Sequence, residues 1–585
     1  MRRAILSVIA ALVVSTLSAC GGGGNPPPPP GPSVTVSPAT ANVQEGMSQQ
    51  FTAAVTGTSS TGVNWQVNGV MGGTAATGLI NGNGLYTAPV VIPSPASITI
   101  TAVLQSDSSI SGNSIVTVTA VQFNNASIKG NYVFSVSGVG GSGLPFYLVG
   151  TVTADGNGNI TAGEADSNSV FAGYTVVPQI TGTYSVGSDG RGTLNLSMPA
   201  LSSQQFSYAF ALKALDNAVL NEIDSQVTAA TGNFETQSGA LLTPANFAFG
   251  FSGTAGCGAL NSAGIFNLSS NKLGGVQDVN CGGSITKAQP LSGSYTSVDN
   301  FGRGTGTFSG NSGSSNFVFY VVSTGSYRFL CTNSGTFFLG GANIQTQASF
   351  SNTDFSGGYV VSTSANTQTV PGGGVSYTLI QMNASNGNVS SGYYDVNDTG
   401  GVGQANLTGA YSLNANGRIS GSFNVNGVGL PFAMFLSSPG LGYYLDERTS
   451  AVGGGNIYGQ NSAVNTNSAW AGSYATRQFG YFISSVGTIL PGNATAITGQ
   501  ISSNGAGTLA GTLDINDPLG ILTGQTLQGT YNVTTVAPGR MTVAITTQTD
   551  GTRNYVGYIV NQQQVLLLDV DSGVLTAGGD AIRQF

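Results

Sequence analysis

The sequence has no histidine and few charged residues. Charged side chains make up 6% of its 585 residues, against a usual share of about 25%. Without an imidazole, the chain cannot form a Ser-His-Asp or Cys-His catalytic group or a histidine-ligated metal site. The formal net charge is −8, and no run of Lys or Arg is present to follow a phosphate backbone. These features argue against nucleic acid as a partner and against most common hydrolase designs.

Apolar residues and glycine are plentiful by contrast. The apolar share is 40%, and 88 residues are glycine. The chain can therefore build hydrophobic cores, while its surface must consist mainly of Ser, Thr, Asn, Gln and Gly.

The first 20 residues have the features of an export signal. Arg2 and Arg3 form a positive segment, and residues 4–19 are largely apolar. This stretch is too short for a membrane-spanning helix, which needs about 20 apolar residues. The tetrapeptide LSAC, which ends at Cys20, resembles the lipobox of bacterial lipoproteins. That resemblance implies that the Cys20 thiol carries lipid and anchors the chain to a membrane. The alternative is an ordinary secretory signal with a fortuitous cysteine.

A linker is expected over residues 21–32, which read GGGGNPPPPPGP. Glycines are flexible, and a proline run favours the stiff polyproline II conformation. In the sorting of such lipoproteins, an Asp after the lipidated Cys favours retention at the inner membrane, and Gly21 occupies that place here. The resemblance therefore implies an exported protein on the outer membrane or cell surface.

Residues 33–121 show the pattern of a β-sandwich. Period-two apolar spacing, broken by turn residues, predicts strands at 34–36, 51–55, 63–67, 98–103 and 115–119. Trp65 is expected to point between the two sheets. The segments VTVSPATANVQEGMSQQFTAAV, VNWQV and NGNGLYTAP resemble bacterial Ig-like domains of the group 2 type, which occur on surface proteins and adhesins. The resemblance implies a fold and no particular ligand.

The rest of the chain is one unit repeated four times. A Gly-x-Tyr motif recurs with its tyrosines 111, 116 and 120 residues apart, and a Gly-Arg pair follows each tyrosine. An Asp-x-Asn triplet precedes each tyrosine, with steps of 112, 117 and 119 residues. The motif residues are Tyr184, Tyr295, Tyr411 and Tyr531, then Arg191, Arg303, Arg418 and Arg540, then Asp166, Asp278, Asp395 and Asp514. Two independent markers with nearly the same step indicate true repeats.

The predicted units span residues 124–240, 241–348, 349–461 and 462–585. Each begins with an aromatic strand and ends near a glutamine, at Gln237, Gln347, Gln460 and Gln584. A unit of about 110 residues is the size of a domain and should have its own core. Alternating apolar residues and tight-turn sequences predict about eight antiparallel strands per unit, closed into a small barrel, with a sandwich as the alternative. The predicted fold class is therefore all-β: an Ig-like sandwich followed by four tandem barrels or sandwiches.

The recurrent arginines and tyrosines are interpreted mainly as structural. In one interpretation, each arginine covers apolar surface with its stem or pairs with a local carboxylate such as Asp189 or Asp299. In the other, it offers an anion-pairing fork to an acidic sugar or a neighbouring domain. The first interpretation is favoured, because Gly-Arg stands where a turn is expected. The tyrosines are expected to bury their rings in barrel strands and to bond through their hydroxyls, with a sugar-stacking platform as the alternative.

The Asp-x-Asn triplets are the remaining site candidates. Oxygen-rich loops suit calcium, and the stretch that starts at Asp155 and includes Asp166 faintly resembles an EF-hand loop. Ile160 stands where that loop requires Gly, however, and the last ligand would be Asp instead of Glu. A hairpin turn at residues 155–158 is therefore predicted, with the triplets as Asx turns at strand ends. No metal or other cofactor is expected.

No enzymatic activity and no catalytic residue are predicted. A glycosidase needs two carboxylates across a cleft, but none of the five glutamates lies in a recurrent motif. The pairs Asp395 with Asp398 and Asp514 with Asp517 occur in only two of the four units.

The other three cysteines, Cys257, Cys281 and Cys331, lie in the second unit. In an exported chain two of them should be joined. The strand spacing favours a disulfide between Cys257 and Cys281, which leaves Cys331 as a buried free thiol.

Two functional classes remain open. The first is a lipid-anchored, non-enzymatic binding or scaffold protein of the cell envelope, whose neutral polar surface could meet polysaccharide or other envelope proteins in adhesion or glycan binding. The second is an integral outer-membrane barrel, for which the C-terminal Phe585 is typical, although Ala581 and Arg583 break the alternation of a lipid-facing strand. A carboxylate-dependent, glycan-active enzyme is a third and weaker alternative. The four units resemble tandem β-rich repeats of exported lipoproteins of soil bacteria, a resemblance that implies no activity.

Overall fold

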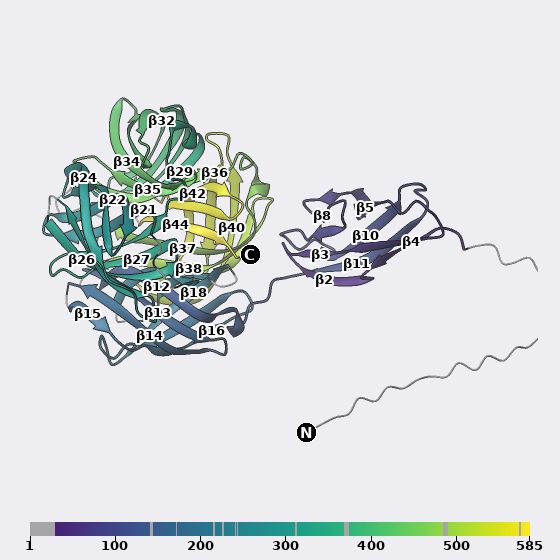
Figure 1. Ribbon diagram of the computed structural model, residues 1–585, viewed down its shortest axis with the longest axis horizontal. Helices are drawn as coiled ribbons and strands as arrows, with labels where there is room; N and C mark the ends of the chain where they lie inside the picture. Colours follow the sequence, from purple (N-terminus) through teal and green to yellow (C-terminus); the bar gives the residue numbers. More distant parts are fainter. Residues whose placement is uncertain are drawn as a thin grey trace, which may run out of the picture. The chain divides into compact units, whose positions relative to one another are not determined.

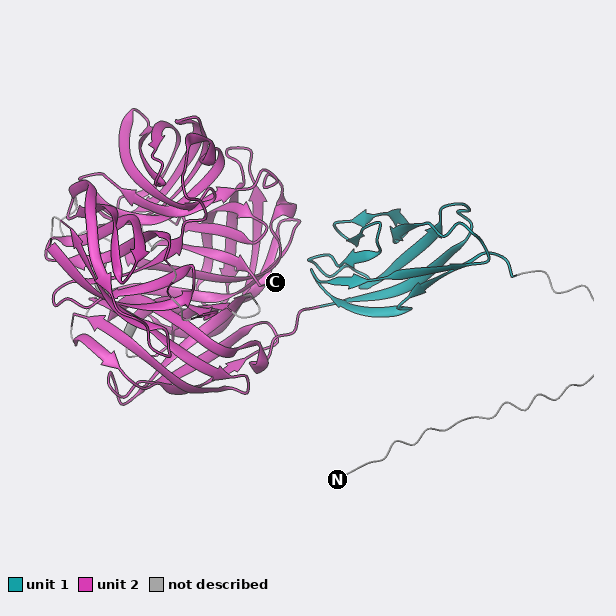
Figure 2. Cartoon of the chain, in the orientation of Figure 1, with its two compact units in different colours: residues 1–119 teal, residues 120–585 magenta. Residues whose placement is uncertain are grey.

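The computed structural model describes residues 30–140, 144–170, 172–214, 217–224, 227–239, 242, 244–310, 313–367, 374–483, 489–571 and 575–584. The predicted signal peptide with Cys20, residues 21–29 of the predicted linker, and Phe585 lie outside the described residues. The chain divides into two compact units, Met1–Thr119 and Ala120–Phe585 (Figure 2). In the described residues, regular structure is β-strand apart from three short 3-10 helices, η1 (Asn125–Ser127), η2 (Asn352–Asp354) and η3 (Asn467–Ala469). The same residues include no helix with the length and hydropathy of a membrane span.

The N-terminal unit consists of three small sheets around one core. A two-stranded sheet pairs β1 (Ser33–Ser37) with β4 (Thr52–Thr56). A five-stranded sheet has the order β2 (Thr40–Gln44), β11 (Ser111–Thr119), β10 (Ser97–Leu104), β5 (Val63–Val67) and β6 (Val70–Met71). A four-stranded sheet has the order β3 (Ser48–Gln50), β9 (Leu85–Thr87), β8 (Gly78–Ile80) and β7 (Gly73–Thr74). β2 and β11 run parallel. Trp65 is buried in the core, as its alternation with Val63 and Val67 indicates.

The second unit consists of four antiparallel β-barrels, with eight strands each in barrels 2, 3 and 4, so the predicted barrel is correct and the alternative sandwich is not. Barrel 2 comprises β21 (Asn246–Ala255), β22 (Gly258–Ser269), β23 (Lys272–Cys281), β24 (Ser284–Tyr295), β25 (Arg303–Gly310), β26 (Gly313–Ser323), β27 (Ser326–Cys331) and β28 (Phe337–Ile344). Barrel 3 comprises β29 (Gly357–Thr367), β30 (Gly374–Ser385), β31 (Asn388–Asp398), β32 (Gly401–Leu413), β33 (Arg418–Val425), β34 (Val428–Ser438), β35 (Leu441–Asp446) and β36 (Ala451–Gln460). Barrel 4 comprises β37 (Ala471–Ile483), β38 (Ile489–Asn504), β39 (Thr508–Asp517), β40 (Gly520–Val533), β41 (Arg540–Thr547), β42 (Gly551–Asn561), β43 (Gln564–Asp569) and β44 (Leu575–Arg583).

Barrel 1 has the same plan with one interrupted strand. It comprises β12 (Lys129–Gly140), β13 (Pro145–Asp155), β14 (Asn159–Ser169), β15 (Gly173–Val177), β16 (Thr181–Val186), β17 (Arg191–Ser197), β18 (Gln205–Ala214), β19 (Asn217–Glu222) and β20 (Val227–Thr236). β15 and β16 pair with opposite ends of β14, so together they take the place of the single fourth strand of the other barrels. The pairs β12 with β20 and β13 with β14 close this barrel.

Alternation along each strand separates a core from a contact surface. In β21, Phe247, Phe249 and Phe251 point into barrel 2 and pack there on other aromatic rings, whereas Ala248 faces barrel 3. Each of the four barrels has its own apolar core. Inward side chains therefore stabilise the single barrel, and outward side chains decide how the barrels meet.

The four barrels form a closed ring, seen as the four bodies of the large unit in Figure 1. Outward apolar side chains join barrel 1 to 2 around Val318, barrel 2 to 3 around Phe435, and barrel 3 to 4 around Leu379. Barrel 4 returns to barrel 1, where β37 and β38 pack on β18, β19 and β20 through small residues such as Ala211 and Ala475. The ring is a consequence of tertiary packing that the linear repeat pattern does not reveal.

Candidate functional site

One buried ion pair, made by the recurrent motifs, joins each barrel to the next. The Asp of the Asp-x-Asn triplet in one barrel accepts hydrogen bonds from the Arg of the Gly-Arg pair in the following barrel. The pairs are Arg303 with Asp166, Arg418 with Asp278, Arg540 with Asp395, and Arg191 with Asp514. The last pair joins barrel 4 to barrel 1 and completes the ring. In the Arg540 pair, Nε and Nη2 lie 2.9 and 2.7 Å from the two carboxylate oxygens of Asp395, the bidentate geometry that gives Arg–carboxylate pairs their strength.

These contacts correct two predictions. The triplets are not Asx turns at strand ends: all four aspartates lie inside strands and are at most 3% exposed. The arginines do not depend mainly on local carboxylates, although Arg191 also lies 3.7 Å from Asp189. The alternative interpretation, an anion-pairing fork for a neighbouring domain, is the one that the contacts confirm. The predicted hairpin turn at Asp155 is present, with the Asp155 carboxylate accepting from the backbone of Asn157. Both corrections have one cause, since a side chain on the outer face of a barrel is buried only when another barrel covers it.

Amide side chains also connect each barrel to the one that follows it. The Asn of each triplet donates to a backbone carbonyl of the following barrel: Asn168 to Cys331, Asn280 to Asp446, Asn397 to Asp569, and Asn516 to Glu222. A glutamine at the end of the last strand of each barrel, or directly after it, also donates to a carbonyl of the following barrel. These residues are Gln237, Gln345, Gln460 and Gln584. At the junction of barrels 2 and 3, Gln345 makes this contact, and not the Gln347 that the repeat pattern indicated.

The glycine of the Gly-Arg pair has a clear physical role in these junctions. Gly417 has φ of +91°, and a Cβ built on it would lie 2.7 Å from the Gln345 amide nitrogen. Gly539 stands in the same relation to Gln460. Glycine is therefore required both for the turn and for the approach of the preceding barrel.

The recurrent tyrosines lie within their own barrels, as expected, and not at the junctions. Tyr184, Tyr411 and Tyr531 are buried and donate to backbone carbonyls at or beside the 3-10 helix that precedes their barrel. Tyr295 is half-buried and packs on the core of barrel 2. Tyr184, Tyr411 and Tyr531 therefore fix the entry of the chain into their barrels.

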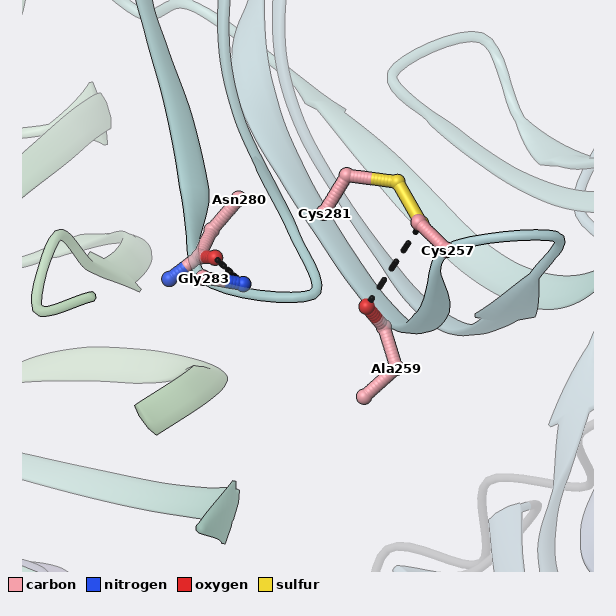
Figure 3. The surroundings of a disulfide bond; sticks show 5 residues. All are labelled: Cys257, Ala259, Asn280, Cys281 and Gly283. Atoms are coloured by element: carbon pink, nitrogen blue, oxygen red, sulfur yellow. Dashed lines mark hydrogen bonds between the residues drawn. A yellow bond between two sulfur atoms is a disulfide. The ribbon is translucent and has the colours of Figure 1, made fainter. Parts of the chain in front are cut away.

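Barrel 2 holds the disulfide, between Cys257 and Cys281, which is the pair that the strand spacing favoured. Figure 3 shows it beside Asn280, whose Oδ1 accepts a hydrogen bond from the Gly283 backbone at 3.1 Å. The Nδ2 of the same Asn280 binds barrel 3. The disulfide therefore holds the hairpin that carries one of the inter-barrel contacts. Cys331 is a buried free thiol, and burial raises its pKa to about 11.

A carboxyl pair at the junction of barrels 1 and 2 gives a pH-dependent contact. Burial raises the pKa of Glu164 to about 7, and Asp299 of barrel 2 adds to the shift. The folded protein therefore binds a proton at Glu164 that the unfolded chain releases above pH about 4.5. We expect the unfolding temperature to fall as pH rises from about 4.5 to 7, and Glu164→Gln to reduce this slope.

Thermal unfolding followed by circular dichroism between pH 4.5 and 8 measures this effect. Burial also raises the pKa of Asp569 in barrel 4 to about 7, so Asp569 contributes to the same slope. Comparing the variant with the wild type isolates the contribution of Glu164. Parallel curves for the two proteins would show that Glu164 does not contribute.

The candidate ligand site is a cavity of about 460 Å³ at the centre of the ring, lined by residues of all four barrels. Its volume lies within the range of about 300–1,000 Å³ that is usual for ligand sites. Aromatic rings and neutral hydroxyl or amide groups dominate the described lining, which contains no charged side chain. The aromatic residues are Tyr147, Tyr377, Phe479 and Tyr481, and the polar residues include Ser137, Ser252, Asn261, Ser364 and Asn366.

Three tyrosine hydroxyls lie near one another in this cavity. Burial raises the pKa of Tyr147, Tyr377 and Tyr481, and the charge of Tyr481 adds to the shift of each of the other two. The value for Tyr481 is about 12. These hydroxyls are therefore neutral at physiological pH and can both donate and accept hydrogen bonds.

Sequence reasoning did not find the cavity residues. Tyr147, Tyr377 and Tyr481 lie on outward faces near the ends of the first or second strands of their barrels. Their alternation with inward residues predicts an outward position. That the outward faces of four barrels meet at one cavity is not encoded in any local sequence pattern.

The described residues include no group of three or more Cys, Asp or Glu side chains arranged to hold a metal ion. Sequence comparison found no matching family model and no matching curated protein. The site is therefore interpreted from its own geometry.

Proposed function

We propose that the chain is a lipid-anchored, non-enzymatic binding protein of the cell envelope, and that the centre of its four-barrel ring binds a glycan. The central cavity is the observation that carries this proposal. Aromatic faces pack well on the C–H faces of sugar rings, and serine and asparagine side chains exchange hydrogen bonds with sugar hydroxyls. The N-terminal sequence supports the location, because its resemblance to a lipobox assigns lipid to Cys20.

The interiors of the barrels favour this proposal over an integral outer-membrane barrel. A membrane-spanning barrel has an apolar outer band and a polar lumen. Here apolar side chains fill the barrel interiors. The outer faces carry the Arg–Asp pairs that join neighbouring barrels. Such outer faces suit contact between barrels better than contact with lipid.

Screening the mature protein on an array of neutral and acidic glycans tests the proposal. We expect binding to a defined set of oligosaccharides, and a loss of affinity of at least about tenfold in Tyr377→Ala, because burial of an aromatic side chain contributes about 1.5–3 kcal/mol. Isothermal titration calorimetry with the strongest oligosaccharide gives the affinity. Tyr377→Phe should retain most of it.

Tyr295→Ala is the matched control, because Tyr295 is a half-buried tyrosine outside the cavity. Its affinity should equal that of the wild type. A wild-type protein that binds no glycan of the array, or a Tyr377→Ala variant with unchanged affinity, would contradict the proposed site.

A further inference from the structure

A cluster of five charged side chains lies among the barrels near the ring centre. This axial charge cluster consists of Lys213 and Glu235 from barrel 1, Arg328 from barrel 2, and Arg477 and Asp580 from barrel 4. Arg328 donates to both carboxylate oxygens of Glu235, at 2.7 and 2.6 Å. Arg477 Nη2 donates to Asp580 Oδ2 at 3.2 Å. With three cations and two carboxylates, the cluster has one positive charge in excess.

Lys213 is the cation without a carboxylate of its own. Its Nζ donates to the amide oxygen of Asn233 at 3.1 Å, and in the described part of the chain it forms no ion pair within 4.0 Å. Arg477 Nη1 donates to the same amide oxygen at 3.0 Å. Burial lowers the pKa of Lys213, which shows the cost of an ammonium group in this place. A buried ammonium is stabilised when an anion approaches it.

In barrel 4 the cluster adjoins the strand segment that lines the central cavity. Arg477, Phe479 and Tyr481 alternate along β37 and so share one face of the strand, with Arg477 about 7 Å from Phe479 along it. The side chains of Arg328 and Arg477 remain 18% and 25% exposed although they lie between barrels.

A second cavity, of about 220 Å³, extends the central one toward the cluster. It shares Ser252, Asn261 and Leu339 with the central cavity. Its lining includes Gly341, where a built Cβ would lie 3.0 Å from Arg328 Nη1. Open space therefore comes close to Arg328, the member of the cluster in barrel 2.

We propose that Lys213 and Arg477 bind an anionic group beside the central cavity, and that the ligand of the ring is a glycan bearing a carboxylate, as uronic acids do. This inference rests on the proposed function and names its ligand class. One carboxylate would balance the single excess charge, and guanidinium and ammonium groups donate charge-assisted hydrogen bonds to it. The neutral part of the sugar would remain against the tyrosines.

Calorimetric titration of the mature protein with uronic acid oligosaccharides and their carboxyl-reduced, neutral counterparts tests the inference. The panel contains galacturonate, glucuronate and mannuronate trisaccharides. We expect the wild type to prefer an acidic ligand over its neutral counterpart by roughly tenfold or more, the range of a hydrogen bond to a charged group.

Lys213→Met should lose this preference and keep its affinity for the neutral ligand, which also shows that the variant is folded. Lys272→Met, at the exposed first residue of β23 in barrel 2, is the matched control and should behave as the wild type.

The outcomes separate the two proposals. Equal affinity of the wild type for acidic and neutral ligands would overturn the carboxylate site and leave glycan binding intact. An unchanged preference in Lys213→Met would likewise overturn the role of Lys213. Absence of binding to every oligosaccharide of the panel and of the array would overturn both. The wild-type preference needs no variant, so a misfolded Lys213→Met protein does not prevent the test.

Discussion

Replacing Asp395 with alanine should lower the free energy of unfolding of the four-barrel unit by about 3–5 kcal/mol, the usual cost of removing one partner of a buried ion pair. The side chains of Asp395 and Arg540 are 3% and 7% exposed. Asp395 also accepts a hydrogen bond from the hydroxyl of Tyr558 at 2.6 Å. The substitution therefore leaves a guanidinium buried between barrels 3 and 4 with Gln404 as its remaining side-chain hydrogen-bond acceptor in the described residues. Urea unfolding followed by circular dichroism measures the loss.

Two further variants decide the cause of this loss. Asp398 lies on the same strand, and in the described part of the chain its carboxylate accepts a hydrogen bond from the Gly400 backbone. Asp398→Ala should therefore cost about 1 kcal/mol or less. The double variant Asp395→Leu, Arg540→Met removes both charges and should recover most of the stability, because apolar side chains of similar size can replace a buried pair. A loss in Asp395→Ala no larger than that in Asp398→Ala would show that the ion pairs do not hold the ring together.

Removing the disulfide of barrel 2 should cost about 3.5 kcal/mol by the loop-entropy relation for residues 24 positions apart. The double variant Cys257→Ser, Cys281→Ser avoids leaving a reactive thiol. The hairpin that ends at Cys281 also carries the Asn280 contact with barrel 3, so the junction of barrels 2 and 3 should open more readily in this variant. Urea unfolding gives the overall loss, and hydrogen exchange of residues 272–295 reports the local one.

Reductant provides the control for this prediction. The wild type in dithiothreitol should unfold at the same urea concentration as the double variant, and dithiothreitol should leave the double variant unchanged. The change in unfolding midpoint caused by Cys331→Ala should be the same with and without dithiothreitol, because Cys331 is a free thiol in the core of barrel 2. An unchanged unfolding midpoint of the wild type in dithiothreitol would mean that the disulfide adds no stability.

The repeat motifs show how far sequence reasoning can reach. The in-phase recurrence of Asp166 and Arg303 with their counterparts identified the residues that matter and placed them in strands or turns. It did not show that each Asp pairs with the Arg of the next barrel, 137 residues away in this case. The sequence did contain one signal for this pairing: the recurrent aspartates and the recurrent arginines are equal in number. Local turn chemistry explained both motifs separately, and so their connection was missed.

The ring closure and the central site depend on the whole assembly. Arg191 meets Asp514, which is 323 residues away, and Gln584 meets the carbonyl of Leu212. A chain of tandem domains with these same contacts between neighbours could equally form an open row. Closure depends on the angle between successive barrels, which the packing of their outward side chains sets. The cavity at the centre exists only when the ring is closed.

The amino-acid sequence by itself determined the all-β class, the four repeats, the eight-stranded barrels and the residues that recur at their junctions, because alternation, turn residues and repeat spacing act over a few residues or between equivalent copies. Only the tertiary structure decided which side chains meet across the junctions, where the chain closes on itself, and that Tyr147, Tyr377 and Tyr481 share one cavity. These features arise from contacts between outward faces of separate barrels, and such contacts leave no periodic pattern along the chain.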